Sequence, residues 1–332
     1  MDRQHELIAT IHDQFEVANK FIVTSHLRPD GDAIGSVLGI GLPLLAIGKD
    51  VQMVLSDGVP DNFRFLSGSE LIKTIPTGKV DYIIVVDSSE IERTDTALIG
   101  YGIPDLNIDH HKTNTNFAKI NLVESGAVAT AEILSKYLPG FSLEISKSVA
   151  NALLAGIVTD TIGFRTSNVY PQVLRLAAEL MELGGDLADI YYRTITEQSI
   201  EAARYWGAGL SKIHMEDGLV WTMLSLSDRH ESGYPSRDDA DLIKILSGIQ
   251  GAKVAVLVIE QSEGYVKISW RLCGSLSTEL DVSEIAQKFG GGGHKAAAGA
   301  EVIGKLDQVL EDVLANTRMF MNHIEKPIGV HT

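Results

Sequence analysis

Apolar and polar positions follow two different periods along this chain. Four short runs of apolar and β-branched residues occur in its first third: FIVTS at 21–25, VQMVLS at 51–56, DYIIVVD at 81–87 and LNID at 106–109. Runs of this length and composition are typical of buried strands. Helical stretches lie between some of them, and this alternation is expected of a parallel sheet with helices on its faces. We therefore predict an α/β fold whose N-terminal part is a doubly wound, mostly parallel sheet.

A helical period dominates much of the remaining N-terminal sequence. Residues 1–20 are amphipathic, residues 33–48 have the composition of a buried helix, and helical patterns return at 129–138, 145–160 and 166–187. The last pattern follows a Ser/Asn start and ends at Gly184-Gly185, both common at helix boundaries. The charged stretch that comes next has a helical period and no strand signal, so we predict a helical connector at 191–215.

Beyond the connector, strand-like and helical patterns alternate again over a shorter length. The strand-like runs are LVWTMLSLS, KVAVLVIEQ and YVKISWRL, and the helical ones are DDADLIKILSGI, DVSEIAQKF and KLDQVLEDVLANTRMFMNHI. This pattern predicts a second, smaller α/β domain. The expected organisation is thus a first domain at 1–190, the connector, and a second domain at 216–325.

Charge and cysteine content narrow the classes of function. The net charge of −16 at pH 7 argues against non-specific binding of long duplex nucleic acid, which requires clustered Lys and Arg. The single cysteine, Cys273, excludes an intrachain disulfide and fits a reducing compartment. The N-terminus lacks the apolar core of an export signal, and the longest uncharged run, 33–48, is too short to span a membrane. We therefore expect a cytoplasmic protein without membrane association.

Ionisable residues gather where the predicted strands end. His26, Asp30 and Asp32 follow the first run, Asp87 ends the third, and Asp109, His110 and His111 end the fourth, while Asp160 ends the helical pattern at 145–160. Taken one by one, these residues have ordinary alternatives as turn formers, helix caps or surface side chains. In open α/β sheets, however, ligands bind at the carboxyl ends of the strands. We therefore expect the whole set to line one crevice.

This set has the chemistry of a centre for two divalent cations. Four carboxylates, Asp30, Asp32, Asp87 and Asp160, would repel one another in a crevice unless cations compensated them. Neutral imidazoles at His26 and His110 can bind metal without changing that balance. Mixed imidazole and carboxylate ligation favours manganese over magnesium, which prefers oxygen ligands and water.

At this point the motifs resemble a known family. HLRPDGDAIGS, VVDSS, NIDHHKTN and GIVTDTIGFRTSN are similar to the successive motifs of the DHH phosphoesterases, and DVSEIAQKFGGGGHKAAAGA resembles the glycine-rich motif of a DHH-associated domain. The resemblance implies that His26, Asp30 and Asp87 hold one metal, and that Asp32, Asp87, His110 and Asp160 hold the other. It also implies that His111 faces the scissile phosphate, with Asp109 behind it, in a two-metal hydrolysis of phosphate esters.

The second domain carries the candidate substrate-binding residues. The tract Gly291, Gly292 and Gly293, followed by His294 and Lys295, would bring backbone amides close to a phosphate, with the dipole of a following helix in support. Arg271 is a candidate for binding a terminal phosphate or a base, and Arg165, near the metal ligands, is a weaker candidate. A flexible loop and ordinary surface arginines are the alternatives.

Family members with two such domains resemble nanoRNases. The resemblance implies hydrolysis of very short RNA to mononucleotides and of 3′-phosphoadenosine 5′-phosphate to AMP, and an acidic surface agrees because it offers no track for long strands. The alternatives are a phosphodiesterase for cyclic or linear dinucleotides, an inorganic pyrophosphatase, and a nucleotide-binding module without activity. The sequence leaves the exact substrate, the cleavage polarity, the metal and a homodimeric state open.

Overall fold

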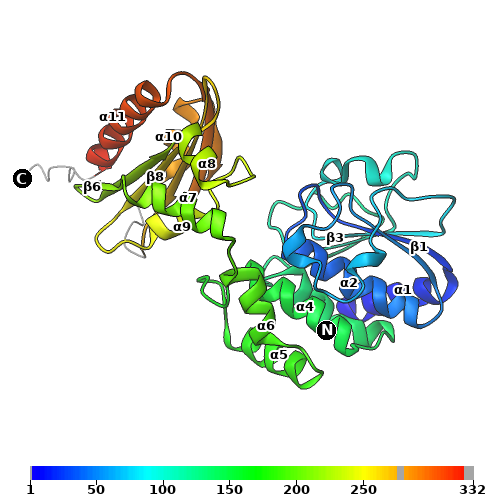
Figure 1. Ribbon diagram of the computed structural model, residues 1–332. Coiled ribbons are helices and arrows are strands. Elements are labelled where there is room, and N and C mark those ends of the chain that lie inside the picture. Colours follow the sequence, from blue (N-terminus) through cyan, green and yellow to red (C-terminus); the bar gives the residue numbers. More distant parts are fainter. Residues whose placement is uncertain (1, 275–279, 325–332) are drawn as a thin grey trace, which may run out of the picture. The chain divides into compact units, whose positions relative to one another are not determined.

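The computed structural model describes residues 2–274 and 280–324. It forms two compact units, Met1–Glu197 and Gln198–Thr332 (Figure 1). The stretch expected as a connector is divided between them. Helix α6 (Leu187–Tyr191) and a π-helical turn, η5 (Tyr192–Thr196), belong to the first unit, whereas α7 (Ile200–Leu210) packs into a core of the second.

The first unit is built on a five-stranded parallel sheet. Its strands are β1 (Lys20–Thr24), β2 (Asp50–Val54), β3 (Tyr82–Val86), β4 (Leu106–Asp109) and β5 (Ile120–Val123), in the order β2-β1-β3-β4-β5. The four runs expected as strands are therefore confirmed. Strand β5 was not predicted, because it is a four-residue edge strand in which Leu122 alone is fully buried.

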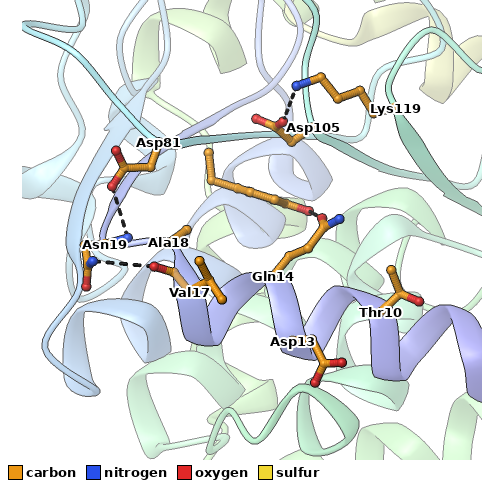
Figure 2. A pocket seen from close by; sticks show the side chains of 10 residues that line it. Thr10, Asp13, Gln14, Val17, Ala18, Asn19, Asp81, Asp105 and Lys119 are labelled. Carbon is orange, nitrogen blue, oxygen red and sulfur yellow. Dashed lines mark hydrogen bonds and ion pairs between the residues drawn. The ribbon is translucent and has the colours of Figure 1, made fainter.

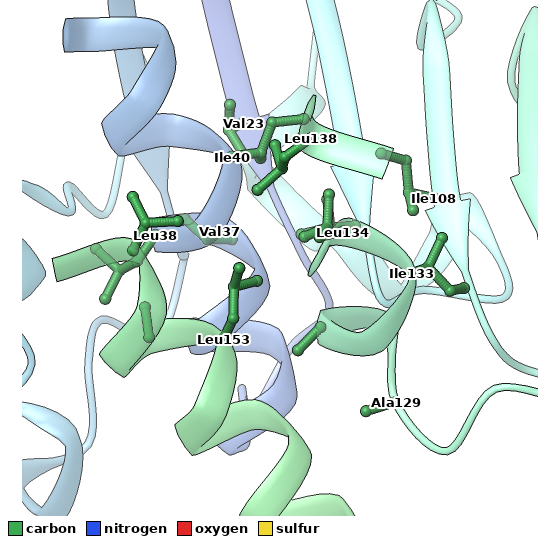
Figure 3. Close-up of a cluster of buried hydrophobic side chains, with 14 of the residues drawn as sticks. Val23, Val37, Leu38, Ile40, Ile108, Ala129, Ile133, Leu134, Leu138 and Leu153 are labelled. Atoms are coloured by element: carbon green, nitrogen blue, oxygen red, sulfur yellow. The ribbon is translucent and has the colours of Figure 1, made fainter. Parts of the chain in front are cut away.

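Helices cover one face of this sheet. They are α1 (Asp2–Val17), α2 (Gly31–Ala46), α3 (Thr130–Tyr137) and α4 (Lys147–Asp160) (Figure 1). Apolar side chains of α2, α3 and α4 form one cluster with Val23 of β1 and Ile108 of β4 (Figure 3). The opposite face packs against the 3-10 segment η3 (Ile91–Leu98). Helix α5 (Pro171–Glu182) begins later than expected, because Tyr170 is extended and Pro171 is suited to the first helical position.

The second unit contains a six-stranded mixed sheet in the order β10-β11-β9-β8-β7-β6. The strands are β6 (His214–Glu216), β7 (Leu219–Leu224), β8 (Val254–Ser262), β9 (Tyr265–Leu272), β10 (Gly292–His294) and β11 (Ala297–Ile303). Helices α10 (Val282–Lys288) and α11 (Leu306–Ile324) pack on one face, and α7 and α9 (Leu242–Ser247) on the other, while α8 (Leu226–Ser232) follows β7. An α/β fold in both parts of the chain is thus confirmed.

Candidate active site

The sheet of the first unit brings the predicted ligands to one edge. His26 lies two residues beyond β1, Asp87 directly follows β3, and Asp109 is the last residue of β4. Because these strands are parallel neighbours, their carboxyl ends meet, and the polar side chains that follow them converge. Asp30 adds to the same edge as the N-cap of α2, where its Oδ1 accepts hydrogen bonds from the next turn.

Close packing of α2 against α4 brings Asp32 and Asp160 together. A Cβ atom on Gly31 would lie 2.2 Å from Thr159 Oγ1, and one on Gly156 would lie 2.8 Å from Asp32 Oδ1. Only glycine fits at these two positions unless the helices separate. The first turn of α2 therefore lies beside the last turn of α4, and Asp160 ends that turn.

The six predicted metal ligands form two adjoining groups. His26 Nε2 lies 3.5 Å from Asp87 Oδ2 and 3.9 Å from Asp30 Oδ1. His110 Nε2 lies 3.6 Å from Asp87 Oδ1, 3.6 Å from Asp160 Oδ2 and 4.0 Å from Asp32 Oδ2. These distances are too long for hydrogen bonds, but two ligand atoms that share an ion at about 2.1 Å lie roughly 3–3.5 Å apart. Each group could hold one metal ion after small shifts of its side chains.

Backbone carbonyls orient the imidazoles of these two groups. His26 Nδ1 lies 2.8 Å from the carbonyl oxygen of Leu27, and His110 Nδ1 lies 3.4 Å from that of Ala127. A proton on Nδ1 satisfies each carbonyl and leaves the lone pair of Nε2 facing the carboxylates. This is the usual support of metal-binding histidines.

Among the described residues, the four carboxylates of this cluster have histidines as ion-pair partners, and no lysine or arginine. Burial raises the pKa of Asp32 well above 3.8, and the nearby Asp87, Asp160 and Asp30 add to the effect. Burial also raises the pKa of Asp160, to about 6. Asp87 is the exception, since its interaction with His26 and the charges of His110 and His111 outweigh its burial and lower its pKa. Bound cations would stabilise the ionised form of these carboxylates.

His111 is held by the carboxylate of Asp109, which is not among the six predicted metal ligands. Its Nδ1 lies 2.7 Å from Oδ1 of the fully buried Asp109, and Asn114 Nδ2 donates to Asp109 Oδ2 at 2.5 Å. The hydrogen bond that His111 donates to Asp109 raises the pKa of His111. With Nδ1 so engaged, Nε2 of His111 is left for another partner. Asn114 was missed in the sequence, although it lies within the DHHKTN motif.

Backbone strain is concentrated around this cluster. Four non-glycine residues with positive φ lie in it or directly beside it: Arg28 (53°), Asp87 (52°), Ile162 (50°) and Phe164 (65°). Such conformations are unfavourable for side chains with a Cβ and persist where surrounding structure enforces them. The structure around the cluster therefore holds the backbone of Asp87 and of the segment after Asp160 in these conformations.

Arg165 lies in the strained segment that follows α4. Its backbone amide donates to Thr161 at 2.8 Å, and its side chain is exposed, without a hydrogen bond or ion pair among the described residues. It is available for a ligand, but no contact joins it to the metal-ligand groups. Its role as a substrate-binding residue stays a prediction.

The glycine tract of the second unit has a structure that differs from the expected one. The residues after it form strand β11, and no helix begins there. A Cβ atom on Gly291 would lie 2.1 Å from the carbonyl oxygen of Gly299, and Gly293 has a φ of +146°. These two glycines are therefore needed by the β10–β11 hairpin itself, whereas Gly292 faces open space. The expected helix dipole was wrong, because pairing with β9 overrides the local alanine-rich sequence.

Arg271 and His294 lie on either side of a small residue in this sheet. Ala297 pairs with His294 on β10 and with Arg271 on β9. Directly paired residues point to the same face of a sheet, and strands lie about 4.8 Å apart. The guanidinium of Arg271 has one long contact, 3.4 Å from Nη1 to the carbonyl of Trp270. The row of His294, Ala297 and Arg271 therefore presents two cationic or hydrogen-bonding side chains roughly 10 Å apart, with the methyl group of Ala297 between them.

A separate cavity of about 820 Å³ lies at the opposite edge of the first sheet (Figure 2). Its lining includes Asn19, Asp81, Asp105 and Lys119, which directly precede strands. Asp81 accepts from the amide of Asn19, and Asp105 pairs with Lys119 at 2.7 Å. Because these carboxylates are already paired and no histidine lines the cavity, the carboxyl edge remains the candidate active site.

Among the described residues, no helix is both long and apolar enough to cross a membrane.

Two family models match the chain: the DHH family, N-terminal domain, over residues 20–157, and the DHHA1 domain, over residues 226–322. The bifunctional oligoribonuclease and PAP phosphatase of Thermus thermophilus is 34% identical, covering 91% of this chain and 90% of that protein. The probable manganese-dependent inorganic pyrophosphatase of Lactococcus lactis is 26% identical over 51% of this chain and 57% of its own length. An exopolyphosphatase-related protein from Bacteroides fragilis shares the fold, with a TM-score of 0.86 at 24% identity, covering 97% of this chain and 98% of that one.

Proposed function

Because this chain belongs to the DHH family of phosphoesterases and is a hydrolase, we propose that it cleaves very short RNA to mononucleotides and converts 3′-phosphoadenosine 5′-phosphate to AMP. The Thermus thermophilus relative carries both activities in its name, and the two proteins match over nine-tenths of their lengths. The proposed reaction is metal-dependent hydrolysis of a phosphodiester or phosphomonoester at the carboxyl edge of the first sheet.

The observation that carries this proposal is the position of Asp87 between two histidine groups. Its Oδ2 faces His26 and its Oδ1 faces His110, at 3.5 and 3.6 Å. A carboxylate so placed can bridge two cations. We propose one metal position at His26, Asp30 and Asp87, and a second at Asp32, Asp87, His110 and Asp160.

Manganese is the cation we propose for both positions. The ligand set mixes imidazole nitrogen and carboxylate oxygen, which suits manganese better than magnesium, and the pyrophosphatase relative is described as manganese-dependent. When bound, such a pair lowers the pKa of a shared water and stabilises charge on the attacking and leaving oxygens.

We propose that the remaining polar residues at the carboxyl edge of the first sheet bind the substrate or position a residue that does. Nε2 of His111 would bind a non-bridging oxygen of the scissile phosphate, because Asp109 already holds Nδ1 at 2.7 Å. Asp109 would thus act by fixing the tautomer and angle of His111 rather than by touching substrate. Arg165, exposed after α4, would bind a phosphate next to the one that is cleaved.

The second unit would bind one end of the substrate. In the row described above, Arg271 and His294 would bind the phosphate or base of a terminal nucleotide, with Lys295 and the amides of Gly291, Gly292 and Gly293 close by. The net charge of −16 repels additional phosphates at low salt. Short ligands would therefore be favoured, and long duplexes and membranes are not expected as partners. We infer the cytoplasm as the compartment, and we propose residues 1–190, 191–215 and 216–325 as catalytic domain, connector and substrate-binding domain.

A product-resolved assay tests this function. The purified protein, with Mn²⁺, is given RNA of two to 24 nucleotides, 3′-phosphoadenosine 5′-phosphate, cyclic dinucleotides and pyrophosphate. We expect the highest rate per end for RNA of two to about five nucleotides, because binding energy from one held end positions a phosphate at a fixed reach. Equal or faster cleavage of a 24-mer at low salt would contradict the end-binding proposal. A strong preference for cyclic dinucleotides or pyrophosphate would support those alternatives instead.

A further inference from the structure

Thr130, the first residue of α3, contacts two of the proposed ligand carboxylates. Its backbone N–H donates to Asp32 Oδ2 at 2.6 Å, and its hydroxyl donates to Asp87 Oδ1 at 3.0 Å. All three residues are at most 2% exposed. These contacts are therefore shielded from bulk solvent, and the sequence shows none of them, since Asp87 and Asp32 lie 43 and 98 positions away from Thr130.

The hydroxyl of Thr130 has no role in ending or capping its own helix. The N-cap position of α3 is Ala129, whose methyl side chain cannot accept a hydrogen bond, and the acceptor of the Thr130 hydroxyl belongs to the loop after β3. A threonine in the first turn of a helix usually bonds to backbone nearby. Here the side chain is directed into the ligand cluster instead.

The contacts of Thr130 concern one side of the cluster only. The oxygen that it contacts on Asp87, Oδ1, is the one that faces His110, whereas Oδ2 faces His26. Thr130 has no hydrogen bond to His26 or Asp30 among the described residues.

The other carboxylate on this side, Asp32, is equally restricted. Its Oδ1 accepts from the amide of Ala131 at 2.9 Å and from Ser36 Oγ at 3.3 Å, and its Oδ2 accepts from Thr130. A carboxylate offers about four lone-pair positions. Three are occupied, so Asp32 can give an ion a single bond in a fixed direction.

We propose that Thr130 is a positioning residue that acts mainly on the second metal position, that of Asp32, Asp87, His110 and Asp160, and less on the first, whose ligands share only Asp87 with it. It would do so by fixing the rotation of the Asp87 carboxylate through its hydroxyl, while its amide and that of Ala131 fix Asp32. This inference rests on the proposed two-metal function. It adds a residue that holds no metal and touches no substrate, but changes the affinity of one ion more than that of the other.

The test is a calorimetric titration of the full-length protein with Mn²⁺ alone. Wild type should bind two ions. Thr130→Val, which keeps the shape but removes the donor, should bind one ion about 10–100-fold more weakly, the usual effect of losing a partner of a metal ligand, and the other with an affinity much closer to wild type. Thr130→Ser should restore the second ion to wild-type affinity. Thr222→Val is the matched control, because Thr222 is a buried threonine of the second unit whose hydroxyl donates to the carbonyl of Gly209 at 2.6 Å.

The outcomes separate this inference from the proposed function. Two wild-type binding events in Thr130→Val, or equal weakening of both, would overturn the role of Thr130 and leave the two-metal function standing. A wild-type protein that binds no pair of ions would overturn the function itself. If Thr130→Val does not fold by circular dichroism, Thr130→Ala replaces it; failure of both to fold while Thr130→Ser folds would assign the hydroxyl to folding and overturn the inference.

Discussion

Replacing Asp87 by asparagine should abolish the metal response of this protein without unfolding it. Asp87 is 2% exposed and has a φ of 52°. Asparagine tolerates this left-handed conformation much better than alanine does, so Asp87→Ala would add backbone strain to the loss of a ligand. Asparagine can also keep both neighbours, since its Oδ1 can accept from Thr130 and its Nδ2 can donate to the free Nε2 of His26.

The size of the effect follows from ligand linkage. Each ion contributes about 2.7 kcal/mol when its free concentration is 100 times its Kd. The first unit spans Met1–Glu197, and a domain of that size shifts its melting midpoint by about 2–4 °C per kcal/mol. Wild type should therefore gain roughly 10–20 °C from a bound pair. Asp87→Asn should lose most of this gain, because the bridging ligand serves both positions.

Differential scanning fluorimetry with and without Mn²⁺, together with hydrolysis of a dinucleotide, measures both parts of this prediction. We expect the metal-free midpoint of Asp87→Asn to lie within a few degrees of wild type. Asp13→Asn is the control, since it removes the same charge from an exposed position on α1. A folded Asp87→Asn protein with the wild-type Mn²⁺ shift or wild-type turnover would refute the two-metal assignment.

Three further predictions address the other parts of the molecule. Asp109→Asn should lower turnover about 10–100-fold through His111 and leave the Mn²⁺ melting shift intact; unchanged turnover would contradict its positioning role. Burial raises the pKa of Asp228, but hydrogen bonds from Lys212 and Ser225 outweigh it and bring the pKa below 3.8, so this carboxylate stabilises the second unit above about pH 4 and the gain is lost as pH falls through the lower folded value. Asp228→Asn should lower the free energy of unfolding, measured with urea, by about 1–3 kcal/mol at pH 7. The variant should also lose less of this free energy than wild type as the pH falls below about 4, and an equal loss in both proteins would contradict the prediction. A chain ended after Glu197 should keep its Mn²⁺ shift and lose at least about tenfold in dinucleotide kcat/KM, and full efficiency would argue against substrate binding by the second unit.

The convergence of the proposed metal ligands was predictable from the sequence for a simple reason. Parallel strands place their carboxyl ends at one edge whatever their side chains do. His26, Asp87 and Asp109 follow three neighbouring strands, so finding the strands was enough to bring these residues together. Asp160 was harder, because it ends a helix, and its place beside Asp32 depends on glycines at 31 and 156 that let two helices approach closely.

The glycine tract was mispredicted because local signals there compete with sheet pairing. The stretch KAAAGA after it has the composition of a helix, yet Ala297–Ile303 pairs along its whole length with β9. Strand pairing is a long-range contact, and it overrides intrinsic preference where a strand completes a sheet. The same pairing produced the row of His294, Ala297 and Arg271, which spacing along the sequence could not reveal.

The orientation of the ligands is a different problem from their position. A carboxylate at the right edge of the sheet can still turn either oxygen toward an ion, and its direction is set by whatever donates to it. Apart from Ser36 on α2, the donors to Asp32 and Asp87 come from the first turn of α3, which lies beyond β5 in the sequence and carries no proposed metal ligand. In the sequence, residues 129–138 have only the pattern of a helix, and nothing in that period says that Thr130 is directed at two carboxylates. The amino-acid pattern thus determines which groups meet, whereas the packing of α3 determines which of their oxygens remain free to bind a cation. On our proposal, the second metal position depends on that packing more than the first does.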